Sequence, residues 1–276
     1  MTFIFFSDLD ETLLDRGTYD WGRALPGLNL LKKKGIPLIL MTSKTLEETV
    51  EFLEEMEVED AFSVENGGAA FIPRSRAPEA GDDIAVKTGS YVRKVLGTPL
   101  SEILAFYRDF LEKHDPPFRA MTDMTLDEVV ETTGLPAAMA RKALARSYDL
   151  PFWAGPGSED HLRRLAGQAS RKGLSVVSGG RFHHLKGAAD KGTAFDAIRP
   201  HYPCDGDGGP VRTVGLGDSE NDASFLAKAD LPVIIRRLDG TWDPRLAAAL
   251  PKALRTETAG PAGWAEAVFS VLSPRR

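Results

Sequence analysis

Short, continuously apolar runs separated by helix-like stretches constrain the fold of this chain most strongly. Such runs occur at residues 3–7, 36–41, 61–64, 212–216 and 231–235. A strand that is apolar at every position is typical of a parallel sheet buried on both faces. The stretch 24–34 between the first two runs has helical character and ends in Lys32-Lys33-Lys34-Gly35, a cationic last turn with a glycine stop. The sequence therefore predicts an α/β fold with a Rossmann-like, doubly wound parallel sheet.

The pattern changes in the middle of the chain, which indicates an inserted domain. Residues 74–83 are rich in proline, glycine and charge and read as a loop. Helix patterns then begin after Thr98-Pro99, after Leu135-Pro136 and near Ser158. The parallel-sheet pattern resumes with a predicted helix at 192–200. We therefore predict a catalytic core of residues 1–83 and 187–276, interrupted by an α+β cap domain at 84–186.

Two carboxylates directly follow the first apolar run. Asp8 and Asp10 are two residues apart, so they project from the same side of an extended chain. They lie just past the carboxyl end of the strand, where open α/β sheets place their ligands. Adjacent carboxylates repel each other unless a cation lies between them, so the pair suits a hard divalent metal or a nucleophile with its acid/base partner. Alone, such a pair also occurs in solvated loops.

A second acidic cluster strengthens this interpretation. Gly217-Asp218-Ser219-Glu220-Asn221-Asp222 also follows an apolar run, although a helix N-cap is an ordinary alternative for such residues. Facing the first pair across one sheet edge, the cluster could hold Mg²⁺ and leave room for a phosphate. Thr42 after the second run offers a hydroxyl to a phosphate oxygen. Lys191 before a predicted helix could neutralise its charge.

Charge and cysteine content exclude several functions. The net charge of −6 disfavours nucleic-acid binding, and no apolar run is long enough for a membrane helix. We therefore expect no nucleic-acid or membrane partner. Residues 141–186, however, hold nine basic residues against three acidic ones, which suggests an anionic ligand or merely solvated helix faces. The N-terminus lacks the pattern of a signal peptide, and the single Cys204 allows no intrachain disulfide. We expect a cytoplasmic protein with a reduced thiol, as a monomer or homodimer.

Asp8-Leu9-Asp10-Glu11-Thr12, Thr42, Lys191-Gly192 and the 217–222 cluster resemble, in order, the four motifs of the haloacid dehalogenase superfamily. The insertion between the second and third motifs is similar to the type C2 cap of its sugar-phosphatase branch. Segments 42–45, 65–68, 146–149 and 179–192 most resemble the mannosyl-3-phosphoglycerate phosphatase family. One departure is Glu11, where the superfamily more often has a small residue.

The resemblance implies a two-step phosphomonoester hydrolysis. Asp8 would be the nucleophile and Asp10 the general acid and base, with Thr42 and Lys191 at the phosphate. Mg²⁺ would be held by Asp8, by the Asp10 backbone carbonyl and by Asp218. Asn221 and Asp222 would support this shell. The residues expected to bind a phosphorylated sugar or glycerate substrate are Ser43, Lys44, Asn66, Gly180, Arg181 and His183.

Substrate recognition leaves alternatives open. Two glycines before Arg181 permit a tight turn that presents its planar fork of donors, which suits a glycerate carboxylate. His183 is equally well explained as an ordinary strand residue. Three hypotheses compete with this function. They are a phosphohexomutase, a phosphatase for glucosyl-3-phosphoglycerate or sucrose phosphate, and a non-catalytic sugar-phosphate-binding module.

Overall fold

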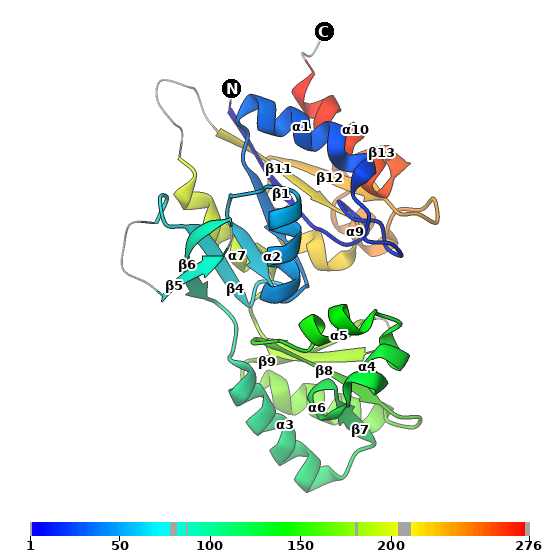
Figure 1. Ribbon diagram of the computed structural model, residues 1–276. Coiled ribbons are helices and arrows are strands. Elements are labelled where there is room, and N and C mark those ends of the chain that lie inside the picture. Colours follow the sequence, from blue (N-terminus) through cyan, green and yellow to red (C-terminus); the bar gives the residue numbers. More distant parts are fainter. Residues whose placement is uncertain (1, 78–81, 87, 180–181, 204–210, 274–276) are drawn as a thin grey trace.

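The separated apolar runs assemble into one nine-stranded sheet (Figure 1). The computed structural model describes residues 2–77, 82–86, 88–179, 182–203 and 211–273. Across the sheet the strands are β13 (Leu254–Ala259), β12 (Leu231–Arg236), β11 (Val211–Gly217), β1 (Thr2–Ser7), β2 (Leu38–Met41), β3 (Phe62–Val64), β4 (Ala69–Pro73), β6 (Gly89–Val95) and β5 (Asp82–Val86). All pairs from β13 to β3 are parallel, so the predicted parallel core sheet is confirmed.

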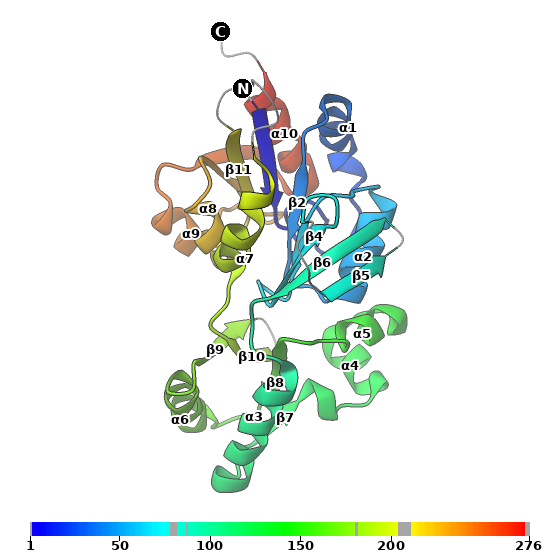
Figure 2. The same cartoon turned by 90° about the vertical axis from the view of Figure 1, so that its left-hand side faces the viewer.

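Helices cover both faces of this sheet (Figure 2). One face carries α1 (Leu25–Lys34), α2 (Leu46–Glu55) and α10 (Gly260–Leu272). The other carries α7 (Lys191–Ile198), α8 (Ala223–Leu226) and α9 (Pro244–Ala249). Along β1, Phe5 packs with the first set, whereas Ile4 and Phe6 pack with the second. Because successive side chains of a strand point to opposite faces, burial of both faces accounts for the unbroken apolar run.

The predicted boundary between core and cap at residues 83 and 84 is too early. Strands β5 and β6 form an antiparallel hairpin that extends the core sheet beyond β4. The sequence did not reveal β5 because the strand begins with two aspartates and has only three apolar residues, and all five of its residues are at least partly exposed at the sheet edge. The chain leaves the core sheet only after Val95.

The inserted domain is a second, four-stranded antiparallel sheet with its own helices. Its strands, in spatial order, are β7 (Phe118–Ala120), β8 (Asp149–Ala154), β10 (Phe182–Gly187) and β9 (Leu174–Gly179). The helices α3 (Leu100–His114) and α6 (Glu159–Ser170) share a buried cluster with one face of this sheet. The pair α4 (Leu126–Thr133) and α5 (Ala137–Ala143) packs around Met121 and Phe182.

Four single 3₁₀ turns complete the described elements: Gly22–Ala24, Met121–Asp123, Arg199–His201 and Glu220–Asp222. Within the described part of the chain, no helix combines the length and apolar character that a bilayer span requires. Cys204 and most of the 203–210 segment lie outside the described residues.

Candidate active site

The sheet order brings the ends of three neighbouring strands together. Strand β1 lies between β11 and β2, so Asp8, Asp218 and Thr42, which follow these strands, emerge at one edge. The Asp8 backbone N–H donates to the Leu216 carbonyl at 2.9 Å, which extends the strand pairing as far as the carboxylate. Asp8, Asp218 and Thr42 are all buried. The two acidic clusters of the sequence therefore meet at one point of the fold.

Lys191 joins these clusters through its ammonium group. The fully buried Nζ lies 2.6 Å from Oδ1 of Asp8 and 2.6 Å from Oδ1 of Asp222. Burial alone would lower the pKa of Lys191, but the two carboxylates raise it above its ordinary value. The other oxygen of Asp222 accepts hydrogen bonds from the backbone N–H groups of Asp218 and Ser219. Both oxygens of Asp222 therefore have partners: one binds Lys191, and the other binds the backbone of the loop at Asp218 and Ser219.

The carboxylates around Lys191 repel one another. Asp8, Asp218 and Asp222 each offer a carboxylate oxygen, and these oxygens lie within 4.8 Å of one another. Burial raises the pKa of Asp8 well above its usual range against the opposing effect of Lys191. Burial, with Asp222 and Glu11 nearby, raises the pKa of Asp218 to about 7, although Arg237 opposes this. Three buried carboxylates that repel one another and offer only oxygen ligands suit a hard divalent cation.

Asp10 and Lys44 form a second ion pair at the mouth of the site. The Lys44 Nζ lies 2.9 Å from Oδ1 of Asp10 and 4.4 Å from the centroid of the Tyr19 ring. Burial lowers the pKa of Lys44, but Asp10 and Glu48 more than offset this and raise it. Lys44, expected to bind substrate, therefore already holds the side chain of Asp10.

A turn between β3 and β4 connects this site to the cap. Glu65, Asn66 and Gly67 have φ of 49°, 54° and 90° in succession. The Asn66 side chain accepts a hydrogen bond from Asn221 at 3.4 Å. The buried carboxylate of Glu65 accepts from the backbone N–H groups of Ser147 and Tyr148 at 2.8 and 2.9 Å, and burial raises its pKa. One short turn thus contacts both the acidic loop of the core and the cap.

Gly67→Ala is expected to destabilise the protein by more than about 3 kcal/mol. A Cβ at this position would lie 2.0 Å from the backbone oxygen of Asp190, so backbone must shift. The matched control is Gly173→Ala, which also has a positive φ of 72° but meets nothing within 4 Å. The control should cost only about 1 kcal/mol. Urea unfolding of both variants checks the difference, and equal losses would contradict the close contact.

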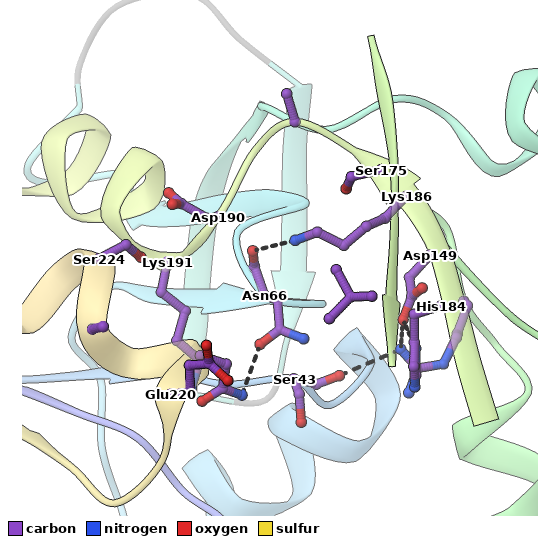
Figure 3. Close-up of a pocket in the computed structure, with 15 residues that line it drawn as sticks. Ser43, Asn66, Asp149, Ser175, His184, Lys186, Asp190, Lys191, Glu220 and Ser224 are labelled. Carbon is purple, nitrogen blue, oxygen red and sulfur yellow. Dashed lines mark hydrogen bonds and ion pairs between the residues drawn. The ribbon is translucent and has the colours of Figure 1, made fainter. Parts of the chain in front are cut away.

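A cleft of about 680 Å³ separates the two domains at this point (Figure 3). Lys191, Asn66, Ser43 and Asn221 reach it from the core. From the cap come Arg146, Asp149, Ser175, His184 and Lys186. Figure 3 shows Asp149, His184 and Lys186 on the cap strands, facing Lys191 and Glu220 on the core helices. The volume is that of an ordinary small-molecule site.

The structure distributes the predicted substrate-binding residues unevenly. Ser43 and Asn66 line the cleft, whereas His183 packs its ring on Phe152, 5.6 Å away, and His184 lines the cleft in its place. Strand alternation explains this difference, because adjacent residues of β10 face opposite sides. Gly180 and Arg181 lie outside the described residues. The same alternation identifies Lys186, two positions after His184, as a cleft residue that the sequence analysis did not select.

Comparison with known proteins agrees with this fold and site. Residues 5–80 match the model of the haloacid dehalogenase-like hydrolase family. A phosphatase of the haloalkanoate superfamily from Bacteroides thetaiotaomicron has the same fold, with a TM-score of 0.66 and 16% identity over 98% of this chain and 95% of that one. Together with the sheet and the paired acidic loops, these matches define a haloacid dehalogenase-like hydrolase.

Two relatives narrow the family. The glucosyl-3-phosphoglycerate/mannosyl-3-phosphoglycerate phosphatase of Persephonella marina is 33% identical, over 98% of this chain and 97% of its own. The protein of the same name from Methanococcoides burtonii is 34% identical, over 99% and 98%. The chain therefore belongs to the glucosyl-3-phosphoglycerate/mannosyl-3-phosphoglycerate phosphatase family, which confirms the resemblance seen in its motifs.

Proposed function

We propose that the protein is a Mg²⁺-dependent phosphatase that hydrolyses mannosyl-3-phosphoglycerate to mannosylglycerate and phosphate. The observation that carries this proposal is the buried Lys191, bound at 2.6 Å to Asp8 and next to Asp218, on the core side of the cleft. The names of the two relatives support the substrate. Because those names include both sugars, glucosyl-3-phosphoglycerate is the second candidate.

In the proposed reaction Asp8 is the nucleophile. Its carboxylate forms a bond to phosphorus while the bond from phosphorus to the leaving oxygen breaks, giving an aspartyl phosphate. Asp10 donates the proton that the leaving oxygen needs. Asp10 then takes a proton from the water that attacks the aspartyl phosphate, so that phosphate leaves and both residues return to their initial states. This cycle consumes one water and requires no other reactant.

The remaining core residues bind and orient the phosphoryl group. Lys191 keeps a positive charge against Asp8, and Thr42 offers its hydroxyl at the adjacent strand end. Asp222 holds Lys191 in place, and Asn221 contacts Asn66 on the core side of the cleft. Mg²⁺ would be held by the carboxylates of Asp8 and Asp218 and the backbone carbonyl of Asp10. The chemistry that this cation supplies is neutralisation of negative charge on the transferring group.

The decisive experiment measures phosphate release across a substrate panel. The panel contains mannosyl- and glucosyl-3-phosphoglycerate, a hexose phosphate, sucrose phosphate and an aryl phosphate. Highest kcat/KM with a glycosyl-3-phosphoglycerate and stoichiometric free phosphate are expected. Transfer of the phosphate to another sugar position would identify a phosphohexomutase, and no turnover of any member would leave a binding module.

Arg181→Ala is expected to lower the kcat/KM for a glycosyl-3-phosphoglycerate relative to that for a small aryl phosphate by roughly 10- to 100-fold. The prediction follows from the sequence: a guanidinium beside the two glycines suits the glycerate carboxylate, and a charged hydrogen bond is worth about 1.5–3 kcal/mol. Steady-state kinetics with both substrates measure the ratio. An unchanged ratio would remove Arg181 from substrate selection.

A further inference from the structure

Asp149 carries a buried charge that the proposed reaction does not use. It begins strand β8 of the cap and is only 1% exposed, yet it lines the cleft. Its Oδ2 accepts hydrogen bonds from Arg146 at 2.9 Å and pairs with Nδ1 of His184 at 2.8 Å. Burial alone raises the pKa of Asp149, but His184 and Arg146 outweigh it and hold this pKa below its usual value. The pairing with Arg146 and His184 therefore favours the ionised form of this carboxylate.

One side of this carboxylate has no partner. Among the described residues, the buried Oδ1 of Asp149 receives no hydrogen bond. The buried Nε of Arg146 likewise has no acceptor. Arg146 directs its Nη1 to Asp149 and to the carbonyl of Ser43, at 2.9 and 3.4 Å. A buried charge-bearing atom without a partner is costly, so such atoms are usually satisfied by a ligand or water.

Asp149 and Arg146 lie where the leaving group of the substrate is expected. Arg146 and His184 line the large cleft and also a second cavity of about 190 Å³, which Asp10 and Lys44 line from the core. Ser43, which accepts from Arg146, directly follows Thr42 at the predicted phosphate position. Figure 3 shows Asp149 and His184 beside each other on the cap side of the cleft, across from Lys191. A group attached to the phosphate oxygen would extend toward this side.

We propose that Asp149, oriented by Arg146 and His184, is a cap subsite for a hydroxyl group of the substrate's leaving group. The proposal rests on the phosphatase function proposed above. A hydroxyl donates one hydrogen bond to Oδ1 of Asp149 and can accept another from Nε of Arg146, so it suits both unpaired atoms. A ligand carboxylate is repelled from Oδ1 by like charge. The subsite therefore accepts a hydroxyl group of the leaving group and not its glycerate carboxylate.

The first test is Asp149→Asn with two substrates. If Arg146 and His184 keep their acceptor, the amide NH₂ replaces Oδ1 and offers a donor where the substrate hydroxyl also donates. The ratio of kcat/KM for glycosyl-3-phosphoglycerate to that for p-nitrophenyl phosphate, which has no hydroxyl, should fall roughly 10- to 100-fold. The matched control is Asp160→Asn, an exposed cap carboxylate, which should keep the wild-type ratio. A wild-type ratio in Asp149→Asn would overturn the proposal.

The second test uses the wild-type protein and therefore does not depend on folding of a variant. Glycosyl-3-phosphoglycerates in which each hydroxyl is replaced in turn by hydrogen are compared with the parent. One of them should lose roughly 10-fold or more in kcat/KM, and Asp149→Asn should lose little further on that analogue. Equal kcat/KM for all analogues would overturn the subsite alone. Hydrolysis of p-nitrophenyl phosphate but of neither glycosyl-3-phosphoglycerate would overturn the substrate assignment, and the subsite with it.

Discussion

Asp8→Asn is expected to lower kcat by at least about 10³-fold, because the amide cannot attack phosphorus. The fold should survive, since Lys191 keeps its bond to Asp222 and a buried charge disappears. Phosphate release under single-turnover conditions measures the loss, and thermal unfolding confirms that the variant is folded. Near-normal rates would rule out the covalent mechanism.

Two further variants serve as a control for Asp8→Asn and as a test of the second catalytic carboxylate. Asp20→Asn is the matched control: it changes an exposed carboxylate whose Oδ1 accepts from the Gly22 N–H, a role that the amide oxygen can keep. Its kcat should stay close to the wild-type value. Asp10→Asn should also be very slow but should leave the attack by Asp8 possible, so intact-mass spectrometry is expected to detect trapped aspartyl phosphate.

Removal of divalent cations with EDTA is expected to abolish activity, and added Mg²⁺ should restore it. Without a cation, the buried carboxylates of Asp8 and Asp218 lie close together with little to balance their charge except Lys191 and Arg237. Ca²⁺ should restore activity poorly, because its looser coordination lets a carboxylate bind it through both oxygens and lose its line of attack. Full activity in the chelator would mean that the acidic cluster is not a metal site.

A binding measurement separates this cation effect from turnover. Mg²⁺ should raise the unfolding temperature of the wild-type protein, since a ligand that binds only the folded state stabilises it. Asp218→Asn should remove most of that increase, because it takes one carboxylate out of the cluster. An equal increase in the variant would place the cation elsewhere.

The core of the fold could be predicted because each of its signals is local. The run from Phe3 to Ser7 is apolar throughout because both faces of β1 are buried, and Gly35 ends α1 with a φ of 61°, as the cationic turn before it suggested. Thr45 and Glu48, three positions apart, form a capping box at the start of α2, another signal that is local in the sequence. These features depend on neighbours within a few residues.

The connections between the domains could not be predicted, because they depend on how the cap lies over the core. The contact of Glu65 with Ser147 joins residues 82 positions apart, and neither residue type signals it. The exposed edge strand β5 combines two aspartates with a three-residue apolar stretch, which is too short to be recognised as a strand. The choice between His183 and His184 required the strand register, which a single sequence does not define at the start of β10.

The turn at residues 65–68 has a consequence for how the two domains can move. Gly68 accepts backbone hydrogen bonds from Leu96 and Gly97, where the chain enters the cap, while Glu65 binds the cap at Ser147 and Tyr148. These attachments lie side by side along one edge of the cleft. Any opening of the cleft that keeps these hydrogen bonds intact is a hinge rotation of the cap about that edge. Such a rotation must break the contacts of α5 with α2, where Thr45 donates to the Lys142 carbonyl and Lys142 pairs with Glu51, so these contacts hold the cleft closed.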